Sequence, residues 1–151
     1  MKYKLIAIDP GKTGAIACFL HNSIQIYKMP LLHNQLDVEE IFSHLQLTQQ
    51  LIIEKPFILS KQKSNDIILT NYGIIIGLAK LAKCQIEIVS PHIWKKKLGL
   101  TKDKNTSLQL AQQLYPNANI NYYTPKKQEQ TNKLDHDKAE ALLLGHYFLN
   151  K

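Results

Sequence analysis

The hydrophobic positions of this chain follow two patterns, one typical of β-strands and one typical of α-helices, and the strand pattern dominates near the N-terminus. Short apolar runs that stop at polar turn residues are typical of β-strands, and one of them alternates apolar and polar residues with a period of two. The strands predicted in this way cover residues 2–9, 13–20, 24–29, 51–54 and 85–89. The run at 51–54 is short and almost wholly apolar, as expected for a strand covered on both faces.

Helical spacing of apolar residues predicts helices over residues 37–47, 65–83, 92–98, 104–114 and 135–147. Asp37 and Asp135 are the predicted N-caps of the first and last helices, and Asn65 or Asp66 is the predicted N-cap of the longest. The intervening polar stretches, residues 55–64 and 117–133, are predicted to be loops, the second of them mobile.

The order of these elements is three strands, then helices alternating with two more strands, then further helices. Strands joined by short turns pair antiparallel, whereas strands separated by a helix pair parallel. We therefore expect an α/β fold with a mixed five-stranded sheet and helices on both faces, in a single domain covering residues 1–151.

The charge of the chain favours a polyanionic partner. It has 151 residues, is 44% hydrophobic, and carries 19 Lys+Arg against 12 Asp+Glu, for a formal net charge of +7. All of the basic residues are lysines. Phosphates would therefore be bound by ammonium groups and backbone amides rather than by guanidinium groups. The alternative is an ordinary basic protein with no nucleic-acid partner.

Other sequence features indicate a cytoplasmic protein that is not associated with a membrane. Cys18 and Cys84 lie inside apolar runs and lack metal-binding spacing, so we expect buried thiols in a reducing compartment. A strand pattern has begun by Tyr3, which leaves no room for a signal peptide. No apolar run approaches the roughly 18 residues needed to span a bilayer.

Four acidic residues are the main candidates for chemistry. Asp9 and Glu54 each end a predicted strand, and Asp137 and Glu140 are three residues apart in the last predicted helix. Carboxylates at strand ends and at this helical spacing can converge on one point. Such a cluster is unfavourable unless cations neutralise it, and hard divalent cations prefer oxygen ligands.

Each carboxylate also has a simpler interpretation. Asp9 precedes Pro10 and Gly11, a common turn sequence, so its side chain could merely cap a turn. Glu54 could begin an exposed loop, and the two helical acids could be solvated charges on an outer face.

Four segments, in order along nearly the whole chain, resemble RuvC-like Holliday junction resolvases of the RNase H-like nuclease superfamily. The segments are IAIDPGKTG at 6–14, IIEKPF at 52–57, PHIWK at 91–95 followed by Lys104, and DKAEALLL at 137–144. The acidic residue at position 140 is Glu where some relatives carry Asp, which changes its reach by one methylene.

The resemblance implies a metal-dependent, structure-selective endodeoxyribonuclease that acts in DNA recombination and repair. Such an enzyme resolves four-way junctions by paired phosphodiester hydrolysis and works as a homodimer. The four carboxylates would hold two Mg²⁺ ions about 4 Å apart, with Mn²⁺ as a substitute, and Asp9 would bridge them. Lys95 and Lys104 would offset the charge of the transition state.

The resemblance also implies particular DNA contacts. Phe57 would act as an apolar wedge that opens the junction, whereas the alternative is ordinary packing against its own sheet. Besides Lys95 and Lys104, the predicted DNA-binding lysines are Lys55, Lys61, Lys63, Lys126 and Lys127. His136 is a candidate metal or water contact, or else a surface residue. Gly73 and Gly77, four apart on the longest helix, are the candidate dimer interface, or else face the sheet.

Two other classes of protein compete with this interpretation. One is a non-catalytic or differently targeted nucleic-acid-binding protein with the RNase H fold. The other is an ATP-binding protein related to actin and the sugar kinases, whose phosphate loop also follows an apolar strand with Asp, Gly, Thr and Gly. That second class requires two lobes, for which 151 residues are too few. The presence of all four acids favours the nuclease.

Overall fold

The computed structural model describes residues 2–58, 63–124 and 129–151, and its centre is a five-stranded sheet in the order β3–β2–β1–β6–β7. The strands are β1 (Leu5–Asp9), β2 (Ala15–Phe19), β3 (Ile24–Lys28), β6 (Gln50–Glu54) and β7 (Gln85–Val89). β1 pairs antiparallel with β2, and β2 with β3, whereas β6 lies parallel to both β1 and β7. The predicted mixed sheet is confirmed.

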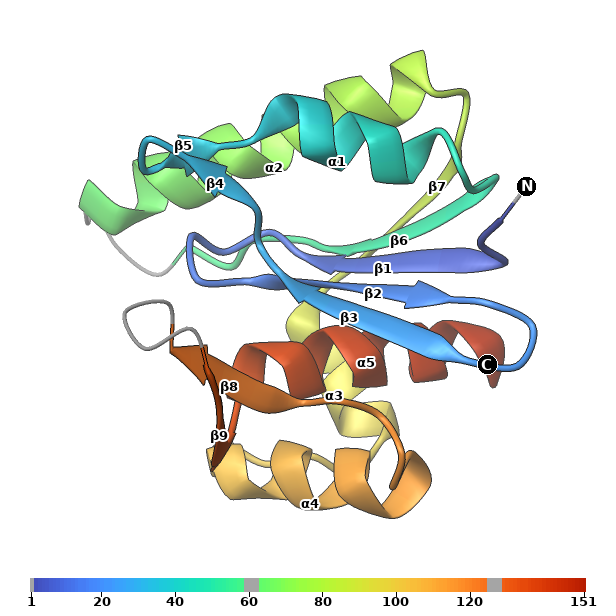
Figure 1. The fold of residues 1–151 in the computed structure, drawn as a ribbon, viewed down its shortest axis with the longest axis vertical. Coiled ribbons are helices and arrows are strands. Elements are labelled where there is room, and N and C mark those ends of the chain that lie inside the picture. Colours follow the sequence, from blue (N-terminus) through green and yellow to red (C-terminus); the bar gives the residue numbers. More distant parts are fainter. Residues whose placement is uncertain (1, 59–62, 125–128) are drawn as a thin grey trace.

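Helices cover both faces of this sheet (Figure 1). The helices are α1 (Val38–Leu45), α2 (Lys63–Leu81), α3 (Pro91–Lys97), α4 (Lys104–Leu114) and α5 (His136–Leu149). α1 and α2 lie on one face, and α5 lies on the other with α4 packed beneath it. None of the described helices combines the length and the apolar character that crossing a bilayer requires.

The alternation of side chains along the strands creates two separate cores. In β1, Leu5 and Ala7 belong to the core under α5, whereas Ile6 and Ile8 belong to the core under α1 and α2. Because side chains alternate between faces with a period of two, Asp9 is placed on the α5 side of the sheet. The same rule places the last residues of β6 and β3 on that side.

All five predicted helices are present, and two of their predicted caps are confirmed. The Asp37 side chain accepts a hydrogen bond from the Glu40 amide, and Asp135 accepts from the amides of Asp137 and Lys138. The predicted cap of α2 is wrong. This helix begins at Lys63, so Asn65 and Asp66 lie inside its first turn.

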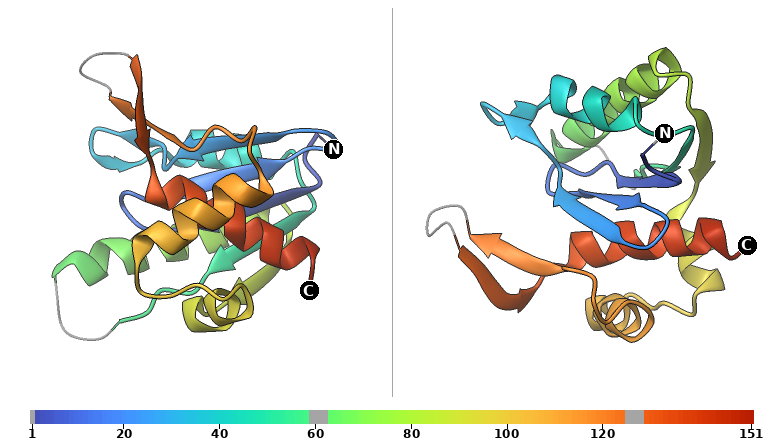
Figure 2. Two further views of the ribbon diagram at one scale, coloured as in Figure 1. Left: turned by 90° about the horizontal axis from the view of Figure 1, so that it is seen from below. Right: turned by 45° about the vertical axis from the view of Figure 1, so that its right-hand side comes forward.

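Two small hairpins were not predicted. β4 (Leu31–Leu32) pairs with β5 (Gln35–Leu36), and β8 (Asn121–Thr124) pairs with β9 (Glu129–Leu134). The second hairpin shows that the loop predicted over 117–133 is wrong. Its strands, NYYT and EQTNKL, do not alternate apolar and polar residues, so periodicity gives no signal. They project from the body of the molecule (Figure 2).

Glycines show how closely α5 and α2 are packed by other parts of the molecule. α5 lies so close to β2 that a methyl group at Gly145 would come within 2.1 Å of the Phe19 ring. Gly73 and Gly77 of α2, by contrast, are exposed, and a methyl group at either would meet no atom within 4 Å. The alternative that the Gly73/Gly77 face packs on the sheet is therefore wrong.

Candidate active site

The structure brings the four candidate carboxylates to one end of the sheet. Asp9 and Glu54 end β1 and β6, which are parallel neighbours with Ile8 paired to Ile53. The first turn of α5, which carries Asp137, lies at the same end, on the left in Figure 1 where β1 turns into β2. The four positions selected from strand ends and helical spacing therefore lie together at one end of the sheet.

Asp9 is held by a tight turn and is largely withdrawn from solvent. Its Oδ1 accepts a hydrogen bond of 3.2 Å from the Gly11 amide. A side chain at Gly14 would place its Cβ 2.1 Å from the Asp9 carbonyl oxygen, so the turn requires glycine there. The pKa of Asp9 is raised to about 6, chiefly by burial and also by the charges of Asp137 and Glu140, despite the Gly11 hydrogen bond.

Glu54 is oriented by a residue that sequence analysis did not single out. The indole Nε1 of Trp94, a fully buried residue of α3, donates a 2.7 Å hydrogen bond to Glu54 Oε2. The pKa of Glu54 is raised to about 7, chiefly by burial and also by the nearby charge of Asp9. Trp94 lies within the PHIWK segment, directly before the candidate catalytic residue Lys95.

Glu140 is only 8% exposed but is fully compensated. Lys95 Nζ lies 2.7 and 2.8 Å from its two carboxylate oxygens, and His136 Nε2 lies 3.1 Å from Oε1. Ser107 donates a further hydrogen bond of 3.3 Å. Burial alone would raise the pKa of Glu140, but the hydrogen bonds from His136 and Lys95 outweigh it and lower the pKa. The interpretation of Glu140 as a solvated surface charge is wrong.

Asp137 is paired with Lys28, which sequence analysis also missed. Lys28 Nζ lies 2.8 Å from Asp137 Oδ2 and also contacts Asp135. The period of two in β3 could have revealed it, because Ile24 and Ile26 face α5 and Lys28 is the next residue on that face.

The four carboxylates thus differ in their counterions. Within the described residues, Asp137 and Glu140 each have a lysine partner, whereas Asp9 and Glu54 form no ion pair. In the same part of the chain, no three acidic, His or Cys side chains are close enough to share one metal ion in this arrangement. Asp9 and Glu54 are nevertheless two buried carboxylates on neighbouring strands with no basic ion-pair partner among the described residues, and hard cations prefer such oxygen donors. Both side chains supply the carboxylate oxygens that Mg²⁺ prefers as ligands.

An open groove of about 750 Å³ adjoins Glu140 and is lined by basic residues. Its lining side chains include those of Lys95, Lys96, Lys102, Lys104, His92 and His136. Lys104 begins α4 and is exposed. The two lysines predicted to assist the chemistry therefore lie on one groove, although only Lys95 contacts a candidate carboxylate.

The predicted DNA contacts can be placed only in part. Phe57 is 68% exposed and follows Glu54 by three residues, so the alternative that it packs against the sheet is wrong. Lys55 is exposed beside it. Lys61, Lys126 and Lys127 lie outside the described residues, and so does the side chain of Lys63.

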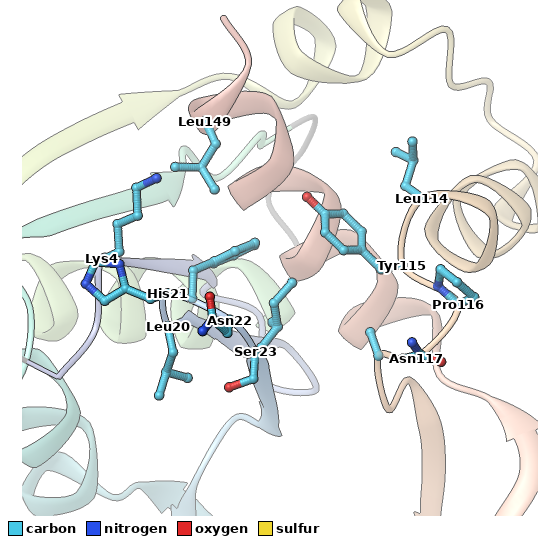
Figure 3. Close-up of a pocket in the computed structure, with 13 residues that line it drawn as sticks. Lys4, Leu20, His21, Asn22, Ser23, Leu114, Tyr115, Pro116, Asn117 and Leu149 are labelled. Carbon is cyan, nitrogen blue, oxygen red and sulfur yellow. The ribbon is translucent and has the colours of Figure 1, made fainter.

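A second hollow, of about 580 Å³, lies at the opposite end of the sheet (Figure 3). The turn between β2 and β3 and the segment after α4 form its walls, with His21 on one side and Tyr115 on the other. None of the candidate site residues lines it. Of these two hollows, the groove beside Glu140 is therefore the one lined by candidate site residues.

Comparison with known proteins identifies the fold. No protein-family model and no curated protein matches the sequence. A solved structure described as T. thermophilus RuvC in complex with Holliday junction substrate is 14% identical, with a TM-score of 0.55, covering 97% of this chain and 94% of that chain. A second structure of Thermus thermophilus RuvC is 12% identical, with a TM-score of 0.57, covering 97% and 95% of the two chains. The chain therefore has a RuvC-like fold over nearly its whole length.

Proposed function

We propose that this chain is a metal-dependent endonuclease that resolves four-way DNA junctions by paired phosphodiester hydrolysis. The observation that carries the proposal is the convergence of Asp9, Glu54, Asp137 and Glu140 beside a lysine-lined groove. The RuvC-like fold supports the substrate class, because one T. thermophilus RuvC structure is described as a complex with Holliday junction substrate.

The metal would be held by the four carboxylates. Asp9 and Glu54 are the primary ligands in this proposal, because they are buried and have no ion-pair partner among the described residues. Asp137 and Glu140 complete the site for two Mg²⁺ ions, with Mn²⁺ as a substitute. When bound, such ions activate a water molecule and stabilise the leaving oxygen of the phosphodiester.

The protein's own residues position and neutralise the reacting groups. His136 and Ser107 both contact Oε1 of Glu140, which fixes that carboxylate. Lys95 contacts Glu140 and lines the same groove, so its ammonium is available to interact with a scissile phosphate there. Lys104, which is exposed on the same groove, adds positive charge where the phosphate gains negative charge.

The DNA duplex arms would be bound mainly through phosphates. Lysines on the groove supply counterions, and Phe57 is exposed three residues after Glu54, in a position to contact unstacked bases. Two symmetric nicks require two sites related by a two-fold axis, so the functional unit in this proposal is a homodimer.

Cleavage of a synthetic four-way junction tests the proposal. We expect paired nicks with Mg²⁺ or Mn²⁺ and none with Ca²⁺ or EDTA. Asp9→Asn should lower the single-turnover rate by about 10³-fold or more while junction binding is retained. Binding without cleavage by the wild-type protein under all of these conditions would instead support a non-catalytic nucleic-acid-binding protein.

A further inference from the structure

Lys28 connects three segments that carry the candidate site. Its Nζ donates hydrogen bonds to the Thr13 carbonyl oxygen, to Asp137 Oδ2 at 2.8 Å and to Asp135 Oδ1 at 3.2 Å. Thr13 belongs to the turn that follows Asp9, and Asp135 caps α5. One ammonium group at the end of β3 therefore links the turn after β1 to the first turn of α5.

The sheet register determines this position. Asp9 pairs with Ala15, and Ala15 pairs with Lys28, so the three residues form one row across β1, β2 and β3. The middle residue is the smallest that carries a side chain, which leaves space on the α5 side for the long lysine arm. Lys28, on the edge strand β3, thus extends toward the same end of α5 as Asp9 does.

The charges around Lys28 make it more than a surface lysine. Asp135 is only 3% exposed, and its Oδ1 already caps the amides of Asp137 and Lys138. Asp137 lies two residues farther along, so two carboxylates share one helical turn. Lys138, the other cation of that turn, donates instead to the Asn121 carbonyl oxygen. Without Lys28, the two carboxylates would repel each other across the cap.

We propose that Lys28 is a positioning residue for the metal site, an inference that rests on the proposed nuclease function. It holds Oδ2 of Asp137, and it fixes the first turn of α5 against the turn that carries Asp9. Partners that orient metal ligands typically change metal affinity by about 10- to 100-fold. Loss of Lys28 therefore weakens metal binding, even though it removes a positive charge that would repel the metal.

The sign of that change separates positioning from simple charge competition. We would measure Mn²⁺ binding by calorimetry, without DNA, for the wild type and for Lys28→Met, Lys28→Gln and Lys28→Arg. Lys28→Met should raise the Kd by about 10- to 100-fold, Lys28→Gln by less, and Lys28→Arg should restore most of the affinity. The matched control is Lys4→Met, an exposed lysine at the other end of the sheet, which should bind Mn²⁺ like the wild type.

Amide hydrogen exchange in the metal-free protein provides a second readout. Exchange at the capped amides of Asp137 and Lys138 should accelerate in Lys28→Met and not in Lys4→Met. Unchanged exchange, or Mn²⁺ binding by Lys28→Met and Lys28→Gln as tight as or tighter than the wild type, overturns the proposal. If the wild type binds no Mn²⁺, or if Asp9→Asn binds Mn²⁺ as tightly as the wild type, the proposed metal function itself fails. The exchange data still report whether Lys28 holds the first turn of α5.

Discussion

The carboxylates of the candidate site are compensated in two ways that have different consequences. Asp137 and Glu140 form ion pairs with lysines from β3 and α3. Among the described residues, Asp9 and Glu54 receive only neutral donors, a peptide N–H and an indole N–H. In the proposed metal site, protons would compete with metal ions for these two carboxylates, because their pKa values are raised to about 6 and about 7.

This competition predicts how the stability of the metal-free protein depends on pH. The folded-state pKa of Asp9 rises from 3.8 to about 6, so folding favours its protonated form. The associated stability is present below pH 4 and is lost as the pH rises through 6. In EDTA at pH 8, Asp9→Asn should therefore be more stable than the wild type by on the order of 1–3 kcal/mol. The difference should shrink toward pH 5.

Thermal unfolding in EDTA and in Mg²⁺ across this pH range measures the effect. Mg²⁺ should raise the Tm of the wild type more at pH 8 than at pH 5, and should have little effect on Asp9→Asn. A wild-type protein that is more stable than Asp9→Asn in EDTA at pH 8 would contradict the assignment of Asp9 as a buried, uncompensated carboxylate.

Trp94 gives a second prediction at the scale of single residues. Trp94→Phe keeps an aromatic ring but removes the hydrogen bond to Glu54, which holds the pKa of Glu54 down against burial. The pH at half-maximal cleavage rate should therefore move upward, and metal affinity should fall by about 10- to 100-fold. The control is Tyr115→Phe, which removes a 2.8 Å contact with His146 away from the site and should leave the pH profile unchanged.

The sequence revealed some of these residues and concealed others for a physical reason. Asp9 and Glu54 interrupt apolar runs, so their positions are visible locally. The roles of Lys28 and Trp94 depend on partners 109 and 40 residues away in the chain. Such contacts arise only when β3 and α3 pack near α5 and β6, and no local pattern encodes that packing.

At the scale of elements, the close approach of α5 to β2 determines where the helical acids lie. Gly145→Ala would push a methyl group into the Phe19 ring and displace the helix. We expect a loss of about 1–3 kcal/mol in the free energy of unfolding, together with slower cleavage, because Glu140 moves with the helix. Chemical denaturation and single-turnover kinetics measure the two effects.

A double-mutant cycle separates this steric effect from the loss of glycine itself. Phe19→Leu removes the ring atoms that a methyl group at position 145 would meet. The combination with Gly145→Ala should therefore cost less than the sum of the two single changes. Additive costs would show that the contact between α5 and β2 does not limit the position of the helix.

The elements that the sequence predicted well are those with one buried face. α4 and β7 were predicted with their observed bounds; α4 packs Ala111 against the core, and β7 packs Val89 there. The hairpin of β4 and β5 escaped notice because it turns through His33 and Asn34, both with positive φ, rather than through glycine. The strands β8 and β9 escaped because their sequences, NYYT and EQTNKL, do not alternate apolar and polar residues.

At the scale of the whole molecule, different lysines should contribute to DNA binding and to the cleavage step. Lys104 lies on the groove beside Glu140 but contacts no carboxylate among the described residues. Lys104→Ala should therefore lower the single-turnover rate on bound junction by about 10-fold or more, with little change in junction affinity. Lys55→Ala, near Phe57, should instead weaken binding and reduce its dependence on salt concentration. An effect of Lys104→Ala on affinity alone would remove it from the catalytic assignment.

The expected homodimer concerns the outer face of α2. Leu69, Gly73, Gly77 and Leu81 share this face, which is exposed, while Ile75 and Ala79 on the other side are buried against the core. Two copies of this helix can approach closely because neither glycine carries a side chain. Leu69→Lys should therefore raise the dimer Kd by at least about 10-fold and uncouple the two nicks, whereas Leu114→Lys, at an exposed leucine of α4, should do neither. Light scattering at micromolar concentration, with and without a four-way junction, measures the assembly. A wild-type monomer under both conditions would require the two nicks to be made by independent encounters.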